Sequence, residues 1–214
     1  MAYRNKTFVS FSSTDLAQYR LMTAWNANQN IDFNFHDAHD LNTALDTSQP
    51  ETIRRRLRER LANTRQVILL IGEDTAAKAA QANSFIHYEV EVIDQLDLPV
   101  VFANLNQSRT AQNTKIPAAL RKKYTLSVSF QPKVIQYALD HLPDWHANNT
   151  RTQEKAGPFY LKSSVYDDLR LTWDADRVFV RAIEAGNLAG WLEAIRIGGS
   201  PVESRHDRCC CIVL

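Results

Sequence analysis

Strand-like and helix-like segments alternate between residues 7 and 141 of this 214-residue chain, and this alternation constrains the fold more than any other feature. The strand-like segments are short, apolar and rich in β-branched and aromatic residues, and they lie at residues 7–11, 32–35, 67–71, 99–105 and 126–130. Helical patterns lie at residues 15–27, 48–61, 84–96, 117–122 and 133–141. Such alternation predicts a flavodoxin-like α/β fold, in which helices cover both faces of a five-stranded parallel sheet.

The alternation stops after Trp145, so we place the end of the α/β domain there and assign residues 1–145 to it. Residues 146–200 are predicted to form a C-terminal extension, with a polar linker at 146–157, an edge strand at 158–161 and two helical stretches. Residues 201–214 contain all three cysteines of the chain, and we expect this tail to be disordered.

Composition excludes several classes of function. The formal net charge is +1, so the chain as a whole lacks the basic surface typical of nucleic-acid binding. It has no apolar run of the length, about 20 residues, that a membrane span needs, and its N-terminus shows no signal-peptide pattern. The absence of cysteine before residue 209 argues against a disulfide framework or a cysteine-based zinc site. We therefore expect a cytoplasmic protein.

The segment 84–96 carries the strongest candidate for a catalytic residue. Ile86, Val90 and Ile93 recur at helical spacing and predict a buried face, and Glu89 borders that face. A helix that follows a parallel strand starts near the carboxyl edge of the sheet, where open α/β sheets bind their ligands. The alternative is that Glu89 is a solvated surface residue, as most glutamates on amphipathic helices are.

Two polar loops are expected at the same edge. Residues 12–15 follow the first strand and, with the helix that carries Glu89, border the switch point of the sheet, and residues 36–48 follow the second strand at the same edge. In the second loop, His36, Asp37, His39 and Asp40 allow three interpretations: a metal site, turn hydrogen bonds, or contacts to a substrate. We favour substrate contacts and predict no metal. Phosphate-binding glycine loops and the hydrolase nucleophile elbow are absent from the sequence.

Taken in order, four segments resemble the TIR domain family. The opening at residues 8–15 resembles the family's first strand and loop, and residues 36–48 occupy the place of its BB loop. Residues 67–71 resemble its central strand, and residues 84–89 resemble the segment in which an aromatic residue precedes the catalytic glutamate by four. The resemblance covers about residues 6–142 and is greatest to the TIR-like proteins of bacterial Thoeris anti-phage systems. The second loop lacks the Arg-Asp and Pro-Gly features of receptor-adaptor TIR domains.

This resemblance implies an enzyme that cleaves the nicotinamide–ribose bond of NAD, with Glu89 as the catalytic residue. It implies that NAD is the substrate, that no cofactor is needed, and that the product is an ADP-ribose-derived signalling nucleotide, cyclic or conjugated, made in anti-phage defence. It further implies a homo-oligomer formed through TIR–TIR contacts and a downstream nucleotide-sensing effector. The substrate-binding residues would be Phe11, Ser12, Asp15, His36, Asp37, Asp40 and Tyr88. The alternative is a non-catalytic TIR-like protein-interaction module.

The last four residues, Cys211 to Leu214, match the C-a-a-X pattern for prenylation with a leucine ending. Cys209 and Cys210, with nearby arginines, resemble the second signal that such an anchor requires. Lipidation of Cys211 is the one route by which we expect this chain to reach a membrane.

Overall fold

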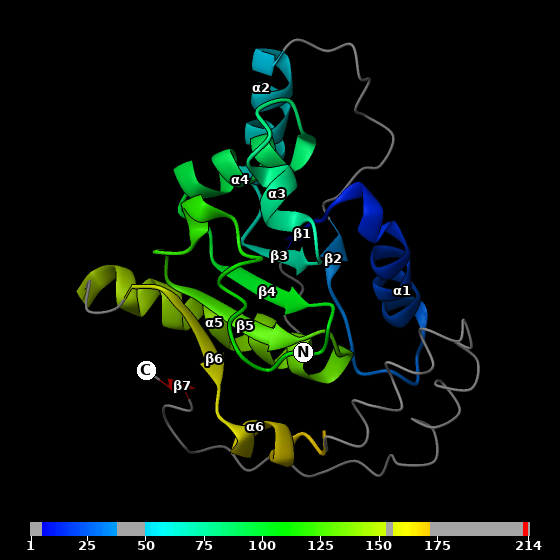
Figure 1. The fold of residues 1–214 in the computed structure, drawn as a ribbon. Coiled ribbons are helices and arrows are strands. Elements are labelled where there is room, and N and C mark those ends of the chain that lie inside the picture. Colours follow the sequence, from blue (N-terminus) through cyan, green and yellow to red (C-terminus); the bar gives the residue numbers. More distant parts are fainter. Residues whose placement is uncertain (1–5, 38–49, 153–155, 172–211, 214) are drawn as a thin grey trace. The chain divides into compact units, whose positions relative to one another are not determined.

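In the computed structural model, six parallel strands form one sheet in the order β2-β1-β3-β4-β5-β6 (Figure 1). The structure describes residues 6–37, 50–152, 156–171 and 212–213. The strands are β1 (Lys6–Ser10), β2 (His36–Asp37), β3 (Gln66–Ile71), β4 (Val100–Asn104), β5 (Thr125–Ser129) and β6 (Pro158–Leu161). The order of the first five strands is the flavodoxin-like order, which confirms the predicted fold class. Strand β6 lies where the sequence predicted an edge strand.

Strands β3, β4 and β5 are buried along their whole length because helices cover both faces of this sheet. The helices are α1 (Leu16–Ala27), α2 (Pro50–Leu61), α3 (Thr75–Ala79), α4 (Phe85–Gln95) and α5 (Pro132–Thr152), with 3-10 turns η1 (Ser13–Asp15) and η2 (Ala118–Leu120). Figure 1 shows α2, α3 and α4 gathered on one side. There Leu61 and Ile93 pack with Phe8, Leu69 and Phe102 of the sheet.

The chain divides into two units, residues 1–160 and 161–214. The described part of the second unit contains helix α6 (Ser163–Asp168) and the two-residue strand β7 (Ile212–Val213). Among the residues that the structure describes, no helix has the length and apolar character needed to cross a membrane.

The second strand was placed wrongly by the sequence pattern. Residues 32–35 are irregular, and β2 begins at His36. The aromatic alternation that suggested a strand instead reflects side-chain packing. The rings of Phe33 and Trp25 are perpendicular, with centroids 5.7 Å apart, and the ring centroids of Phe33 and Phe35 are 5.4 Å apart. The backbone N–H of Phe35 bonds to the Asn26 side chain at 3.1 Å rather than to a neighbouring strand.

The last helix of the first unit is longer than predicted. Helix α5 continues through Pro143 to Thr152, across residues where the sequence suggested a linker. Proline usually ends a helix because it lacks a backbone donor and clashes with the preceding turn. Here Tyr137, His141 and Trp145 stack along one face at four-residue spacing, with ring centroids 4.2 and 5.4 Å apart, and this row crosses the proline.

Candidate active site

Glu89 lies on the second turn of α4 and points toward the end of β1. Helix α4 begins after Ser84, whose hydroxyl accepts a hydrogen bond from the backbone N–H of His87. The Glu89 side chain is 7% exposed, and its Oε2 accepts a hydrogen bond of 2.6 Å from Ser10 Oγ. Ser10 is two residues after Phe8 on β1, so both side chains face α4. The predicted glutamate is therefore buried at the carboxyl edge of the sheet, between α4 and the end of β1.

Burial changes the acid–base behaviour of Glu89. Loss of solvent raises the pKa of Glu89 from 4.5 to about 7, although the Ser10 hydrogen bond and the positive charge of Arg60 act in the opposite direction. At neutral pH the site thus holds a carboxyl group close to its midpoint. A raised carboxyl pKa that combines burial with a specific hydrogen-bond partner is a common sign of a functional site.

Helix α2 holds α4 on both sides of Glu89. Arg54 Nε forms an ion pair of 2.7 Å with Glu91 Oε2, and its guanidinium lies 4.9 Å from the centre of the Tyr88 ring. Tyr88 is itself buried in the core. In this structure Tyr88 therefore packs between two helices, and Glu89 is the buried acidic side chain that turns toward β1.

The loop after β1 places a second buried carboxyl group at the same edge of the sheet. Asp15 is 8% exposed, and its Oδ2 is enclosed without a hydrogen-bond partner. Burial and the nearby charge of Asp74 raise the pKa of Asp15 to about 6, against the opposing effect of Lys78. The Asp15 carboxyl group lies against Gly72, directly after β3, where a Cβ would come within 2.6 Å of Oδ2.

This close approach predicts that Gly72→Ala destabilises the fold only while Asp15 is present. The added methyl group would overlap the carboxyl group, and overpacking of this kind costs about 1–3 kcal/mol. In an Asp15→Ala background the space is open, and the same substitution should cost close to nothing. Urea unfolding of the two single variants and the double variant measures this coupling. An equal cost in both backgrounds would show that the two residues do not compete for space.

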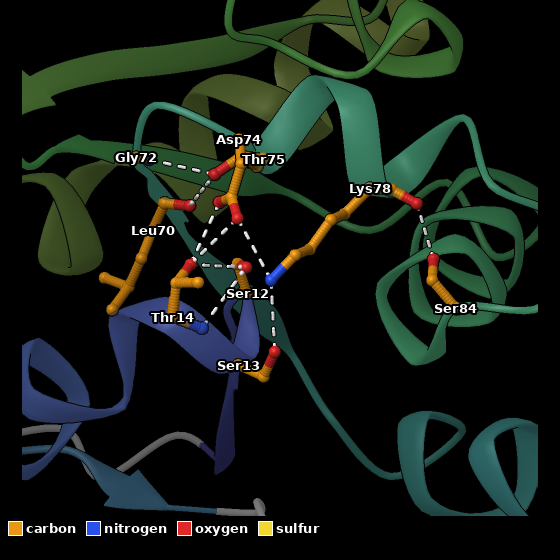
Figure 2. Close-up of polar contacts among 9 residues, drawn as sticks. All are labelled: Ser12, Ser13, Thr14, Leu70, Gly72, Asp74, Thr75, Lys78 and Ser84. Atoms are coloured by element: carbon orange, nitrogen blue, oxygen red, sulfur yellow. Dashed lines mark hydrogen bonds and ion pairs between the residues drawn. The ribbon is translucent and has the colours of Figure 1, made fainter.

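A cluster of hydroxyl groups and one ion pair joins the loop after β1 to α3 (Figure 2). Thr14 Oγ1 donates to the carboxylate of Asp74 at 3.0 and 3.1 Å, and Thr14 Oγ1 lies 2.8 Å from Ser12 Oγ. Lys78 Nζ contacts Asp74 Oδ2 at 3.0 Å and Ser13 Oγ at 3.1 Å. Burial acts to raise the pKa of Asp74, but these hydrogen bonds outweigh it and lower the pKa. We call these five residues the α3 latch.

The structure brings together only part of the predicted substrate-binding set. Ser12 and Asp15 lie in the loop after β1, and Phe11 stacks on Tyr19 with ring centroids 4.6 Å apart. The backbone of β2 pairs His36 with Lys6 and Asp37 with Thr7, beside the first half of β1. Three other predicted residues lie outside the described part of the chain: His39, Asp40 and the candidate lipidation site Cys211.

Sequence reasoning did not single out several residues that shape this site: Ser10, Gly72, Asp74 and Lys78. Ser10 carried a usable signal, since the two-residue period of β1 places it on the same face as Phe8. The contact of Gly72 with Asp15 and the reach of Lys78 to Ser13 depend on how two loops meet, and no local pattern encodes that. Within the described residues, no group of three or more His, Cys, Asp or Glu side chains could hold a metal ion.

The fold and this edge define a TIR-like α/β domain, with a buried glutamate on α4 beside the first strand. Comparison with known families agrees. Residues 8–110 match the family described as Thoeris protein ThsB, TIR-like domain. The match starts in β1, ends in the loop after β4 and includes Ser10, Asp15 and Glu89. This part of the chain is therefore similar to the ThsB TIR-like domain family. No curated protein matches the chain.

Proposed function

We propose that this protein cleaves NAD at the nicotinamide–ribose bond and that Glu89 is the catalytic residue. The observation that carries the proposal is the position of Glu89: a buried carboxyl group at the carboxyl edge of β1, hydrogen-bonded to Ser10, in a domain similar to the ThsB TIR-like family. Ligand sites of open parallel sheets lie at this edge, next to the point where the strand order reverses. In this sheet that point lies between β1 and β3.

Cleavage of the nicotinamide–ribose bond requires little from the protein beyond one correctly positioned negative charge. The bond between ribose C1 and the nicotinamide nitrogen breaks, the electron pair leaves with nicotinamide, and positive charge develops on the ribose as in other glycosyl transfers. An ionised Glu89 beside the ribose would stabilise that charge more strongly in its buried position than it would in water. A nucleophile then bonds to C1. When water is the nucleophile, it loses a proton and the product is ADP-ribose.

Other residues would position the substrate. Ser12 and Asp15 lie in the loop after β1, where a hydroxyl and a carboxyl group suit the ribose hydroxyl groups. Phe11 is partly exposed and presents an aromatic ring at the same edge. Tyr88 would first have to leave its contact with Arg54. His36, Asp37 and Asp40 are retained as contacts from the second loop, on the resemblance alone.

Similarity to a Thoeris family supports a role in anti-phage defence. Within such a system we propose that the product is an ADP-ribose-derived signalling nucleotide, cyclic or conjugated, and that an effector protein senses it. We also propose that copies of the chain assemble through their TIR-like domains. Chromatography and mass spectrometry of the NAD reaction would identify the nucleotide formed.

The test is to incubate purified protein with NAD and to measure nicotinamide release over a range of protein concentrations. Two neighbouring glutamates of α4 provide a matched pair. Glu89→Gln removes the proposed catalytic charge, whereas Glu91→Gln removes a partly exposed carboxylate that pairs with Arg54. We expect release by the wild type and by the Glu91 variant, and its loss in the Glu89 variant. Equal release by both variants would remove Glu89 from the mechanism.

The second candidate is a non-catalytic interaction module, and the burial of the site favours it. Ser10, Ser12, Asp15 and Glu89 are each less than a tenth exposed, as structural polar groups in a core would be. A module would release no nicotinamide at any concentration or pH, while still forming oligomers that sedimentation can detect. Concentration-dependent assembly without NAD turnover would favour this alternative over the enzyme.

A further inference from the structure

The groups assigned to catalysis are enclosed in this structure. Glu89 is 7% exposed, Asp15 is 8% exposed, and Ser10 and Ser12 are almost completely buried. A dinucleotide must make direct contact with such groups before they can hold its ribose or stabilise a developing charge. If the proposed function holds, part of this edge must therefore move before the reaction.

The segment between β3 and α4, residues 72–84, is the best candidate for that movement. Its short helix α3 buries Thr75 and Ala79, and polar contacts connect it to the loop after β1 on one side and to α4 on the other. On one side, Lys78 Nζ reaches Ser13 and Thr14 bonds to Asp74 (Figure 2). On the other side, Nδ1 of His87 on α4 lies 2.8 Å from the backbone carbonyl oxygen of Ala79, whereas the 2.5 Å hydrogen bond from Ser84 Oγ to the carbonyl of Lys78 lies within the segment. Partly exposed ion pairs and hydroxyl contacts of this kind are weak individually, so they can be released.

Asp15 lies beside this segment, and its carboxyl group is in an energetically unfavourable environment. Its Oδ2 is buried without a hydrogen-bond partner, and both carboxyl oxygens lie against Gly72 at the start of the segment. An enclosed carboxyl oxygen without a partner is costly. Moving residues 72–84 away from the loop after β1 would remove that cost, because water or a substrate hydroxyl could then bond to Asp15.

We propose that residues 72–84 form a strap that closes the active site and that the α3 latch of Ser12, Ser13, Thr14, Asp74 and Lys78 holds the strap shut. The closed strap keeps Asp15 from the dinucleotide, at the same edge of the sheet where Glu89 lies. Release of Lys78 and Thr14 from their partners lets the strap open at the β1–β3 end of the sheet. This proposal rests on the proposed function for the identity of the ligand, and on the contacts above for the movement.

The first experiment measures strap opening without any activity. Lys78→Met removes the cation that contacts Ser13 and Asp74, and Thr14→Val removes the hydroxyl that bonds to Asp74 while keeping the side-chain shape. The matched control is Lys123→Met, which removes ion pairs of 3.1 and 3.3 Å to Asp94 and Asp97 at the far end of α4, outside the strap and its latch. All four full-length proteins are compared by amide hydrogen exchange and mass spectrometry.

We expect exchange on the order of fivefold faster in residues 10–17 and 72–87 for the two latch variants, because the loss of a weak contact shifts the opening equilibrium by about that factor. Exchange in β4 and β5 should stay unchanged, and the control should match the wild type. If neither latch variant accelerates amide exchange in these segments, or if the control variant accelerates amide exchange equally, the strap proposal is wrong.

The second experiment measures nicotinamide release by the same proteins at equal concentration. If the strap limits access, both latch variants should turn over NAD on the order of fivefold faster than the wild type, in line with their exchange. An active wild type whose latch variants exchange faster but turn over no more NAD would overturn the strap as a regulator. If no variant releases nicotinamide, the proposed function fails, and the exchange data alone then decide whether the strap opens.

Discussion

Replacing Glu89 by glutamine is expected to abolish most activity while making the fold more stable above neutral pH. Without the negative charge beside the ribose, nicotinamide release should fall by on the order of a hundred- to a thousandfold. Stability should change in the opposite direction, because glutamine keeps an acceptor for the Ser10 hydroxyl but never ionises. A residue that is costly for folding and needed for catalysis is typical of active sites.

The direction of the stability change in the Glu89→Gln variant follows from proton linkage. The pKa of Glu89 is raised from 4.5 to about 7 in the fold, so the folded state holds a proton that the unfolded chain releases at lower pH. The stability from this proton is fully present below about pH 4.5 and is lost as pH rises through about 7. At pH 8 the glutamine variant should therefore be more stable than the wild type by roughly 3 kcal/mol, and near pH 4 the difference should vanish.

Urea unfolding of the wild type and the variant at several pH values measures this difference. Glu91→Gln is the control, because Glu91 is partly exposed and pairs with Arg54. It should not reproduce the gain at pH 8. A glutamine variant of Glu89 that is less stable than the wild type at pH 8 would mean that the ionised carboxylate stabilises the fold.

The activity of the wild type is expected to rise steeply with pH and to level off above pH 7. In the proposed mechanism only ionised Glu89 would stabilise the ribosyl cation, and burial raises the pKa of Glu89 to about 7. The ionised fraction then falls about tenfold for each pH unit below this midpoint, so kcat/KM near pH 5 should be about a hundredth of its plateau. Nicotinamide release followed between pH 5 and 9 gives the profile. A flat profile would argue against an ionised Glu89.

The same profile tests the role of Ser10. The hydroxyl donates to Glu89 Oε2 and so favours the charged form. Ser10→Ala should shift the midpoint of the profile to a pH roughly one unit higher, which a purely structural role would not do. Ser127→Ala is the control, since Ser127 is equally buried on β5 but contacts Asn104. A shift of similar size in both variants would point to a general change in the fold.

The overall topology was predictable because each strand and helix carries its own local signal. The continuous apolar run of β3 reflects a strand covered on both faces. The errors arose where packing between distant segments outweighs local preference. Phe33 and Phe35 alternate like a strand, but Phe33 packs against Trp25 and Phe35 packs against Phe33. Helix α5 continues through Pro143 along a row of aromatic side chains.

The candidate site was likewise predictable from the sequence only in part. The position of Glu89 near the sheet edge was predictable, because the apolar spacing of α4 and its place after β3 put a carboxyl group there. The burial of Glu89 was not predictable, since it depends on Ser10, which lies 79 residues earlier in the chain. The α3 latch was hidden for the same reason, as the partners of Asp74 and Lys78 lie in the loop after β1.

Strand β6 has a consequence for self-association. It pairs in parallel with β5 through Thr125, Leu126 and Ser127, so the outer edge of this part of β5 is already occupied. A strand that lies beside a partner cannot accept an incoming chain by edge-to-edge addition. Extension of the sheet along residues 125–127 is therefore blocked, and filaments or rings of this protein would have to grow through other surfaces.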